Sequence, residues 1–398
     1  MRLNEKNGLR VLLIHTHYQQ YGGEDAVFEA ERSLLNENGC TIQTLQSSND
    51  EMFRQPRIQM AIQSIWNREA YRTTRNIISK MRPHVVHVHN VFHAMSPSVF
   101  HAIKAENVPS VLTLHNFRVA CINGLLFRSG QICEKCVGRM PIAGIAHKCY
   151  RNSLAASVVA ATSLAIHRMI RTWDRTISVF VALTNFSKEK FVEAGIPESR
   201  IAVKPNFLHP DPGAGEGGMG YALYVGRLSP EKGLDVLIDA WKEAGIDIPI
   251  KIVGTGPMVP QVTRTAEGHK SIQVLGEKSR GEVISLMKGA SFLLLPSVVY
   301  ENFPMTIVEA FATGLPVVAS DLGAMASLVD HGRTGLRFRP GDATDLAEKV
   351  EWLLSHPQEL DKMRKEARHE YEVKYTAERN YQLLMGIYER ALEAAKKA

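Results

Sequence analysis

Apolar residues recur along the first half of this chain in short runs separated by amphipathic stretches. The runs RVLLIH, CTIQTL, HVVHVHN, SVLTLH, SVFVALT and IAVKPN each have the length and composition of a buried strand. Between them, the spacing of apolar positions predicts helices from Glu24 to Asn38 and from Pro97 to Glu106. A strand–helix–strand order at this spacing predicts a parallel sheet with right-handed crossovers.

The same order begins again after residue 220. Strands are predicted at YALYVG, IKIVG, IQVLG, SFLLLP, PVVAS and GLRFRP, with helices at 233–245, 257–267, 280–288, 303–313, 324–330 and 342–355. Between the two series lies FLHPDPGAGEGGMG, residues 207–220, which holds five glycines and two prolines. This composition predicts a flexible linker.

The predicted fold class is therefore α/β, with two doubly wound parallel-sheet domains, 1–206 and 221–375, facing each other across a cleft. The tail, residues 376–398, is predicted to be helical and to pack back onto the first domain. Doubly wound sheets bind ligands beyond the carboxyl ends of their strands, so the cleft between the domains is the expected site.

The composition is that of an ordinary globular protein. Of 398 residues, 45% are hydrophobic and 22% are charged. The longest uncharged apolar run, Leu154 to Ile166, is too short to span a bilayer, and the first residues show no secretory signal. Five cysteines in a chain of this length fit a reducing compartment, so a cytoplasmic location is expected.

The positive charge is concentrated in one segment. Residues 54–82 contain seven Arg or Lys and one Glu, which equals the net charge of +6 of the whole chain. A single basic segment indicates a local anionic partner rather than nucleic acid. The apolar stretch 153–171 is also flanked by cations: Lys148, Arg151, Arg168 and Arg171. Together with the basic segment, this stretch suggests a face for anionic membrane headgroups. The alternative is a solvated basic surface.

Two cations follow the first strand of the second series. Arg227 and Lys232 lie five residues apart on the loop that leads into the next helix. Because a helix N-terminus itself favours anions, this placement suits a diphosphate, although solvated surface is the alternative for such a pair alone.

Two glutamates frame the helix that follows SFLLLPS. Glu301 precedes the predicted helix and Glu309 lies in its second turn, with Pro304 in the first turn and Gly314 at the end. Eight residues at about 1.5 Å each would separate the carboxylates by about 12 Å. That distance suits a ligand with a diphosphate between two hydroxyl-rich rings, one at each carboxylate. The N–H groups near Phe303, Met305 and Thr306 would then face a phosphate. The alternative is a pair of surface glutamates.

Two glycine turns could also approach a phosphate. Gly22 and Gly23 precede a helix in YGGEDAVF, and Gly254 lies in the turn VGTGP at residues 253–257. Glycine allows the backbone to come close to a ligand, but the dinucleotide pattern GxGxxG is absent.

These segments together resemble the retaining GT-B glycosyltransferases of family four, which use sugar nucleotides and build bacterial polysaccharides. The matching pieces, in order, are GGED, TLHN, YVGRLSPEKG, VGTGP, LGEKSRGEV and PSVVYENFPMTIVEAFATGLPVVASDLGA. The resemblance implies that Arg227 and Lys232 hold the donor diphosphate and that Glu309 takes the ribose hydroxyls. It places Glu301, Asn302, Phe303, Met305 and Thr306 around the donor sugar and phosphate, Gly22, Gly23 and Gly254 by the phosphate, and His115 near the reacting centre. Family members often have EGFG or EPFG where this chain has ENFP, so Pro304 removes one backbone donor there.

The function implied is transfer of a sugar from a UDP- or GDP-sugar to a hydroxyl of a glycan or polyprenyl-linked glycan in cell-surface polysaccharide synthesis. No catalytic metal is expected, because no DxD motif follows a strand and Arg227 and Lys232 can neutralise the leaving diphosphate. The alternatives are a nucleotide-sugar 2-epimerase of the same fold and a non-catalytic sugar-nucleotide-binding partner of an assembly complex.

Four cysteines lie in an insertion that follows TLHN. Cys133 and Cys136 form a C-x2-C pair, and Cys121 and Cys149 flank it. This spacing makes them candidate ligands of a structural zinc, with free or redox-labile thiols as the alternative. The position of the insertion beside His115 suggests that it shapes the acceptor side.

Overall fold

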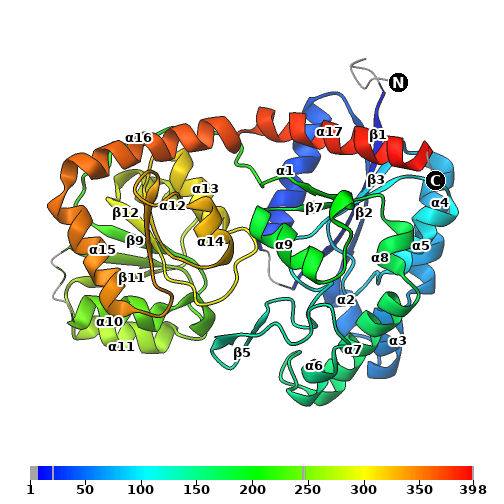
Figure 1. The fold of residues 1–398 in the computed structure, drawn as a ribbon, viewed down its shortest axis with the longest axis horizontal. Coiled ribbons are helices and arrows are strands. Elements are labelled where there is room, and N and C mark those ends of the chain that lie inside the picture. The colour runs from blue at the N-terminus through cyan, green and yellow to red at the C-terminus, as the bar shows by residue number, and fades with distance from the viewer. Residues whose placement is uncertain (1–7, 20–21, 244–245, 247, 397–398) are drawn as a thin grey trace. The chain divides into compact units, whose positions relative to one another are not determined.

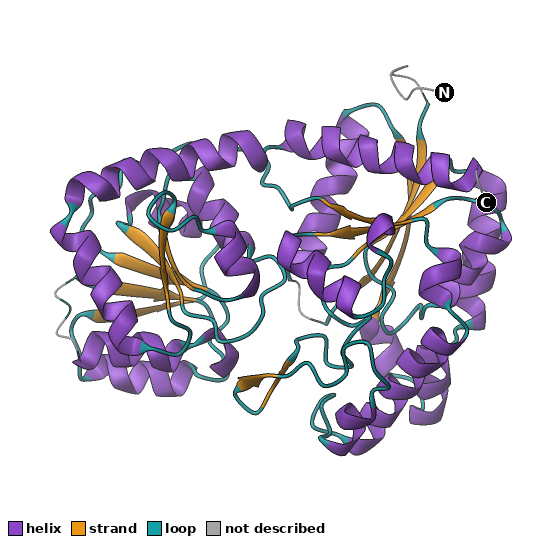
Figure 2. Ribbon diagram, viewed as in Figure 1, coloured by secondary structure: helices purple, strands orange, loops and turns teal. Residues whose placement is uncertain are grey.

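The computed structural model describes residues 8–19, 22–243, 246 and 248–396. The chain divides into two compact units (Figure 1). The first contains Met1–Leu126, Glu134–Asn206 and Asn380–Ala398, and the second contains Phe127–Cys133 and Phe207–Arg379. Each unit is a parallel sheet with helices on both faces, as Figure 2 shows, so the predicted two-domain α/β fold class is confirmed.

The sheet of the first unit has six parallel strands in the order β2-β1-β3-β4-β7-β8. Their bounds are β1 Arg10–His17, β2 Thr41–Ser48, β3 Val85–Val88, β4 Ser110–Thr113, β7 Val179–Ala182 and β8 Ile201–Val203. Each predicted apolar run of the first half forms one of these strands. Because β1, β3 and β4 are neighbours, the loops that follow them meet at one edge of the sheet.

Two helices of the first unit match the predicted ones within two residues: α1 Gly23–Glu37 and α5 Ser98–Ala105. The basic segment folds as α3 and α4, and the apolar stretch forms α7. The remaining bounds are α2 Asn49–Phe53, α3 Arg57–Ile65, α4 Arg68–Met81, α6 Ile142–Ala146, α7 Leu154–Met169, α8 Thr172–Thr176, α9 Asn185–Glu193, the 3-10 turn η1 Glu198–Arg200 and α17 Ala377–Lys396.

The tail helix α17 completes the core of the first unit. Its Leu384, Ile387 and Tyr388 pack with buried residues of the sheet such as Leu13 and Val85. The Tyr388 hydroxyl also lies 2.9 Å from His87 Nδ1. Burial of this apolar face explains why a helix with no following strand is held in place.

The second unit repeats the architecture, with six parallel strands in the order β11-β10-β9-β12-β13-β14. Their bounds are β9 Ala222–Val225, β10 Ile250–Val253, β11 Ile272–Gly276, β12 Phe292–Leu295, β13 Val317–Ser320 and β14 Gly335–Phe338. All six predicted runs are strands, and β9 and β12 lie side by side at the centre.

Helices cover both faces of this second sheet. Their bounds are the 3-10 turn η2 Pro230–Lys232, α10 Leu234–Glu243, α11 Val259–Glu267, α12 Arg280–Gly289, α13 Met305–Ala312, α14 Gly323–Leu328, α15 Ala343–Ser355 and α16 Pro357–Lys374. The end predicted for the helix at 233–245 lies partly outside the described residues. The long α16 follows α15 directly and was not anticipated.

The glycine-rich segment 207–220 contains neither helix nor strand, as expected, but it differs from a freely flexible linker. The N–H groups of Gly215, Gly217 and Met219 donate to carbonyls of Thr313, Lys288 and Gly289. A Cβ on Gly215 would lie 2.4 Å from Lys288 Cα. The glycines therefore let this segment pack closely against the second unit.

The insertion after β4 contains a short antiparallel pair, β5 Phe127–Arg128 and β6 Gln131–Ile132. No helix in the described part of the chain is long and apolar enough to cross a membrane.

Candidate functional site

In the second unit, the loops after β9 and β12 are joined at the carboxyl edge of the sheet. The N–H of Val298 donates to the carbonyl of Glu231 at 3.0 Å. Gly233 has a φ of 70°, and a Cβ there would lie 1.9 Å from the Pro296 carbonyl oxygen. Only glycine allows this close approach, which brings Lys232 and Glu301 to the same place.

Lys232 and Glu301 form an ion pair. The distance from Lys232 Nζ to Glu301 Oε1 is 2.6 Å, and the Ser297 hydroxyl donates to the same oxygen at 2.7 Å. The two charged side chains are 28% and 14% exposed. Two residues that the sequence placed in separate motifs thus form one unit, and Ser297 is a member that sequence analysis missed.

Arg227 lies on the same loop, exposed to solvent, and forms no ion pair with the described residues. Its carbonyl accepts a hydrogen bond from the Tyr224 hydroxyl at 2.9 Å. The backbone of the loop is therefore anchored while the guanidinium is available to a ligand.

Gly254, predicted to lie by the phosphate, supports the shape of this loop. Its φ is 136°, and a Cβ there would lie 1.9 Å from the Gly226 carbonyl oxygen. Gly256 approaches the Leu228 carbonyl in the same way. The turn after β10 thus packs directly against the loop that carries Arg227.

The helix α13 begins at Met305, with Pro304 as its N-cap. Among the described residues, the N–H groups of Met305 and Thr306 have no recorded hydrogen-bond partner, which leaves them available to an anion. Residues 301–304 are not helical, so the 12 Å separation derived from helical rise does not apply to Glu301 and Glu309. Asn302 and Phe303 are partly exposed in this non-helical stretch.

Glu309 lies in the second turn of α13, partly buried. Burial raises the pKa of Glu309 to about 7, and the positive charge of Arg280 opposes this rise. No ion pair to Glu309 is recorded in the described chain. Glu309 is therefore a carboxyl group without an ion-pair partner among the described residues.

In the first unit, histidines gather where β1, β3 and β4 end. His15 and His17 close β1, His89 follows β3, and His115 follows β4. His115 Nε2 lies 3.0 Å from His89 Nδ1. Burial, together with the nearby His89, holds the pKa of His115 well below its ordinary value, so the imidazole is neutral at physiological pH.

A buried ion pair lies beneath these histidines. Lys204 Nζ contacts Glu31 Oε1, and Glu31 Oε2 lies 3.4 Å from His89 Nε2. Burial disfavours the charged carboxylate, but Lys204 and the histidines hold the pKa of Glu31 well below its ordinary value. Sequence analysis missed this pair because the two residues are 173 positions apart.

Gly22 and Gly23 begin α1. The Gly22 N–H donates to Asp25 Oδ2 at 2.9 Å, so this group is occupied inside the protein and is not available to a phosphate. That Gly22 and Gly23 lie by the phosphate stays a prediction. Gly23, the first helical residue, is exposed.

Glu24, also missed from the sequence, lies in a polar cluster at this edge. Asn116 Nδ2 lies 3.2 Å from the Tyr18 hydroxyl and 3.4 Å from Glu24 Oε2. Burial raises the pKa of Glu24 to about 8, and the charge of Arg118 opposes this rise. The available signal was the acidic residue directly after the glycine pair.

The four clustered cysteines do not form a metal-ligand set. In the described chain, the groups of three or more His, Cys, Asp or Glu with ligand atoms within 4.8 Å of one another contain no cysteine. The Cys121 thiol donates to Asn123 Oδ1, and Cys149 packs against the apolar cluster around Ile122 and Leu164. The zinc prediction is not supported, because no three of these sulfur atoms lie within 4.8 Å of one another.

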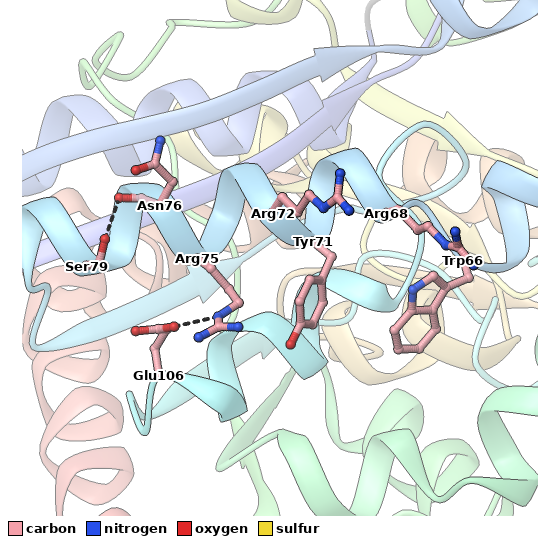
Figure 3. A pocket seen from close by; sticks show the side chains of 8 residues that line it. All are labelled: Trp66, Arg68, Tyr71, Arg72, Arg75, Asn76, Ser79 and Glu106. Atoms are coloured by element: carbon pink, nitrogen blue, oxygen red, sulfur yellow. Dashed lines mark hydrogen bonds and ion pairs between the residues drawn. The ribbon is translucent and has the colours of Figure 1, made fainter.

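The basic segment forms a groove along α4. Its volume is about 670 Å³. Figure 3 shows Tyr71 and Arg75 pointing from α4 toward α5. Arg75 forms an ion pair with Glu106 at 2.6 Å. Arg68 and Arg72 are exposed on the same helix. The helix that precedes α4 in the chain, α3, exposes Ile58 and Ile62 at 78% and 62%. The lining residues are Trp66, Arg68, Tyr71, Arg72, Arg75, Asn76, Ser79 and Glu106.

Part of this chain is similar to known glycosyltransferases. Residues 214–370 match the family model described as glycosyl transferases group 1. An uncharacterized glycosyltransferase of Methanocaldococcus jannaschii is 35% identical over 176 residues, which cover 44% of this chain and 49% of that protein. A phosphatidyl-myo-inositol mannosyltransferase of Mycobacterium leprae is 28% identical over 233 residues, covering 55% of this chain and 59% of that protein. The chain thus spans about half the length of the first of these relatives.

A solved structure shares the architecture of the whole chain. HepE from Anabaena, in complex with UDP-glucose, has a TM-score of 0.64 with 16% identity, covering 96% of this chain and 99% of that one. At this identity the likeness shows the fold, which is the GT-B fold of glycosyltransferases.

Proposed function

We propose that the chain is a glycosyltransferase of polysaccharide or glycolipid synthesis, because residues 214–370 match the family model of glycosyl transferases group 1. It transfers a sugar from a UDP- or GDP-sugar to a hydroxyl of a glycan or polyprenyl-linked glycan. The observation that carries the proposal is the Lys232–Glu301 pair, held beside the N-terminus of α13 by the joined loops of β9 and β12.

The proposed donor site uses the second unit. Lys232, the exposed Arg227 and the N–H groups of Met305 and Thr306 bind the diphosphate, and Glu309 accepts hydrogen bonds from the ribose diol. Glu301 and the Asn302–Phe303 backbone face the sugar. The UDP-glucose bound by HepE supports a donor of this class.

The proposed reaction proceeds with retention of anomeric configuration. The bond from the anomeric carbon to the diphosphate oxygen breaks and its electron pair stays with the diphosphate, which Arg227, Lys232 and the α13 N-terminus stabilise. The acceptor oxygen bonds to the same face of the anomeric carbon, and its proton passes to the leaving diphosphate. His115, neutral at physiological pH, contributes a hydrogen-bonding group from the first unit.

The first unit is the proposed acceptor domain. Glu24, Asn116 and His115 supply polar groups at the edge of its sheet. The Arg-lined groove of α4, with the exposed Ile58 and Ile62 of α3, is proposed to rest on an anionic membrane, because cations and protruding apolar groups together suit a headgroup layer. This placement implies action at the cytoplasmic face.

A donor screen tests the proposal. Thermal unfolding is followed with UDP, GDP and ADP and with their sugars, since a ligand that binds only the folded state raises its stability. Turnover of the stabilising donor is then measured with lipid-linked glycan acceptors, and the anomeric configuration of the product is assigned by NMR.

The two alternatives give different results in the same assay. Conversion of the donor without any acceptor would identify a 2-epimerase. Binding of a nucleotide sugar with no turnover on any acceptor tested would identify a non-catalytic partner. Absence of binding by every nucleotide and nucleotide sugar would contradict the donor site itself.

A further inference from the structure

Three side chains at the end of β1 converge in a way that the proposed donor chemistry does not use. His15 Nε2 lies 2.8 Å and His17 Nδ1 lies 3.0 Å from the same oxygen, Asp25 Oδ1. All three ligand atoms lie within 4.8 Å of one another. We propose that His15, His17 and Asp25 form a binding site for a divalent transition-metal ion of the zinc class.

The charge balance supports a bound cation. Asp25 is only 1% exposed, and within the described residues its recorded ion-pair partners are the two histidines, with no Lys or Arg among them. A buried carboxylate is stable when it is paired with a cation or coordinates a metal. Its other oxygen accepts the Gly22 N–H, which does not supply a full charge.

The hydrogen-bond pattern around His17 points the same way. Gln46 Nε2 donates to Thr44 Oγ1, so Gln46 Oε1 faces His17 Nε2 at 2.7 Å and requires a proton there. In a neutral imidazole, His17 Nδ1 then carries a lone pair that faces the acceptor-only oxygen of Asp25. A cation bound by both groups removes this repulsion. His15 Nε2, which lies 2.8 Å from the same oxygen, would supply the second nitrogen ligand.

Two of the three ligands are held by hydrogen bonds with neighbouring groups, whereas His15 Nδ1 is buried without a hydrogen-bond partner in the described chain. Gln46 fixes the ring of His17, and Gly22 fixes the carboxylate of Asp25. The ring of His15 stacks on Phe28 with centroids 4.6 Å apart and planes 16° from parallel. Such supporting contacts orient the first ligands and tune their affinity.

The donor set selects the class of metal. Two imidazole nitrogens and one carboxylate oxygen suit zinc and its transition-metal neighbours better than calcium or magnesium, which prefer oxygen. Three protein ligands leave a position for water or another oxygen, and His17, 30% exposed, provides access.

The other His–carboxylate group of this unit, Glu31 with His87 and His89, does not make the same case. Its carboxylate already contacts the Lys204 ammonium, which occupies the place of a cation. The proposed site is therefore specific to the end of β1, and it does not depend on the proposed glycosyl transfer.

The test measures Zn²⁺ binding to the full chain. The protein is stripped with a chelator, dialysed and titrated with Zn²⁺ in competition with a chromophoric chelator, and Co²⁺ is used as a spectroscopic substitute. One equivalent should bind, and the Co²⁺ spectrum should lack the charge-transfer band of a cobalt–thiolate bond. Gln46→Leu removes a supporting residue and should weaken Zn²⁺ binding by roughly 10- to 100-fold. His17→Ala and Asp25→Asn each remove a ligand and should weaken it more.

The controls separate this site from others. His356→Ala, on the exposed surface of the second unit, should bind Zn²⁺ as the unmodified chain does. Circular dichroism melts check that each variant folds. If Asp25→Asn does not fold, His17→Ala still tests the site, because His17 is partly exposed. The proposal is overturned if no equivalent binds, if His17→Ala binds unchanged, or if only Cys133→Ser and Cys136→Ser abolish binding.

Discussion

The proposed role of Glu309 predicts that donor binding depends on pH near neutrality. A ribose diol donates hydrogen bonds to an ionised carboxylate, so the donor should bind only the deprotonated form strongly. Burial raises the pKa of Glu309 to about 7 in the free protein. Protons therefore compete with the donor as the pH falls through this value, and binding should weaken in acid rather than in base.

The magnitude follows from the ionised fraction. With a pKa of about 7, Glu309 is about 9% ionised at pH 6 and about 90% ionised at pH 8, and the apparent dissociation constant is the intrinsic one divided by that fraction. The donor Kd should therefore be about tenfold higher at pH 6 than at pH 8, which is about 1.4 kcal/mol. Below pH 6 the slope should approach one decade per pH unit.

Isothermal titration calorimetry with the donor found by the thermal screen measures this dependence. An intact nucleotide sugar is used, because the terminal phosphate of a free nucleoside diphosphate itself titrates near pH 6, roughly like a phosphorylated side chain. Glu309→Gln should bind more weakly at pH 8 and lose the pH dependence, whereas Glu351→Gln, an exposed change on α15, should keep both. Tenfold dependence that persists in Glu309→Gln would refute the assignment, as would a flat profile of the unmodified chain.

Three further changes test other parts of the proposal. Lys232→Ala should remove about 2 to 4 kcal/mol of transition-state stabilisation, seen as a lower kcat/KM, because a preorganised cation at the leaving group is lost. Turnover near that of the exposed control Lys242→Ala would remove Lys232 from the mechanism. In steady-state kinetics at saturating acceptor, Glu301→Gln should mainly lower kcat, because Glu301 acts near the developing charge of the sugar. Glu309→Gln should mainly raise the donor KM. The reverse pattern would show that the sugar end and the ribose end of the donor are misassigned. Ile58→Asp with Ile62→Asp should reduce binding to vesicles rich in anionic lipid, while Val373→Asp, 50% exposed in the second unit, should not; equal binding of all three proteins would exclude α3 from membrane contact.

The strands of both sheets were predictable because each is a compact apolar run bounded by turn residues, as in SFLLLP for β12. Helix ends were predicted within about two residues where a cap marks them, such as Ser279 before α12. The charge pattern of the basic segment does not reveal the break between α3 and α4, where Trp66 and Asn67 have extended backbone.

Contacts between distant segments could not be predicted in the same way. Lys232 meets Glu301 because β9 and β12 are sheet neighbours, and strand order is a property of the whole fold rather than of either motif. The raised pKa of Glu24 depends on burial beside Tyr18 and Asn116, which composition does not report. The cysteine spacing suggested zinc because sequence shows separation along the chain but not where the sulfur atoms point.

The ion pair between Lys232 and Glu301 changes how the proposed donor site operates. A lysine side chain loses considerable conformational entropy when it is fixed, and here Glu301 and the loop contacts already restrict it before any donor arrives. The ammonium has three donors, so it can keep Glu301 and also reach a diphosphate oxygen. Glu301 Oε1 is used by Lys232 and Ser297, which leaves Oε2 as the oxygen that can meet a sugar hydroxyl. The exposed Arg227, with no recorded partner in the described chain, then supplies the adaptable charge, while the Lys232–Glu301 pair fixes the position of the diphosphate relative to the sugar.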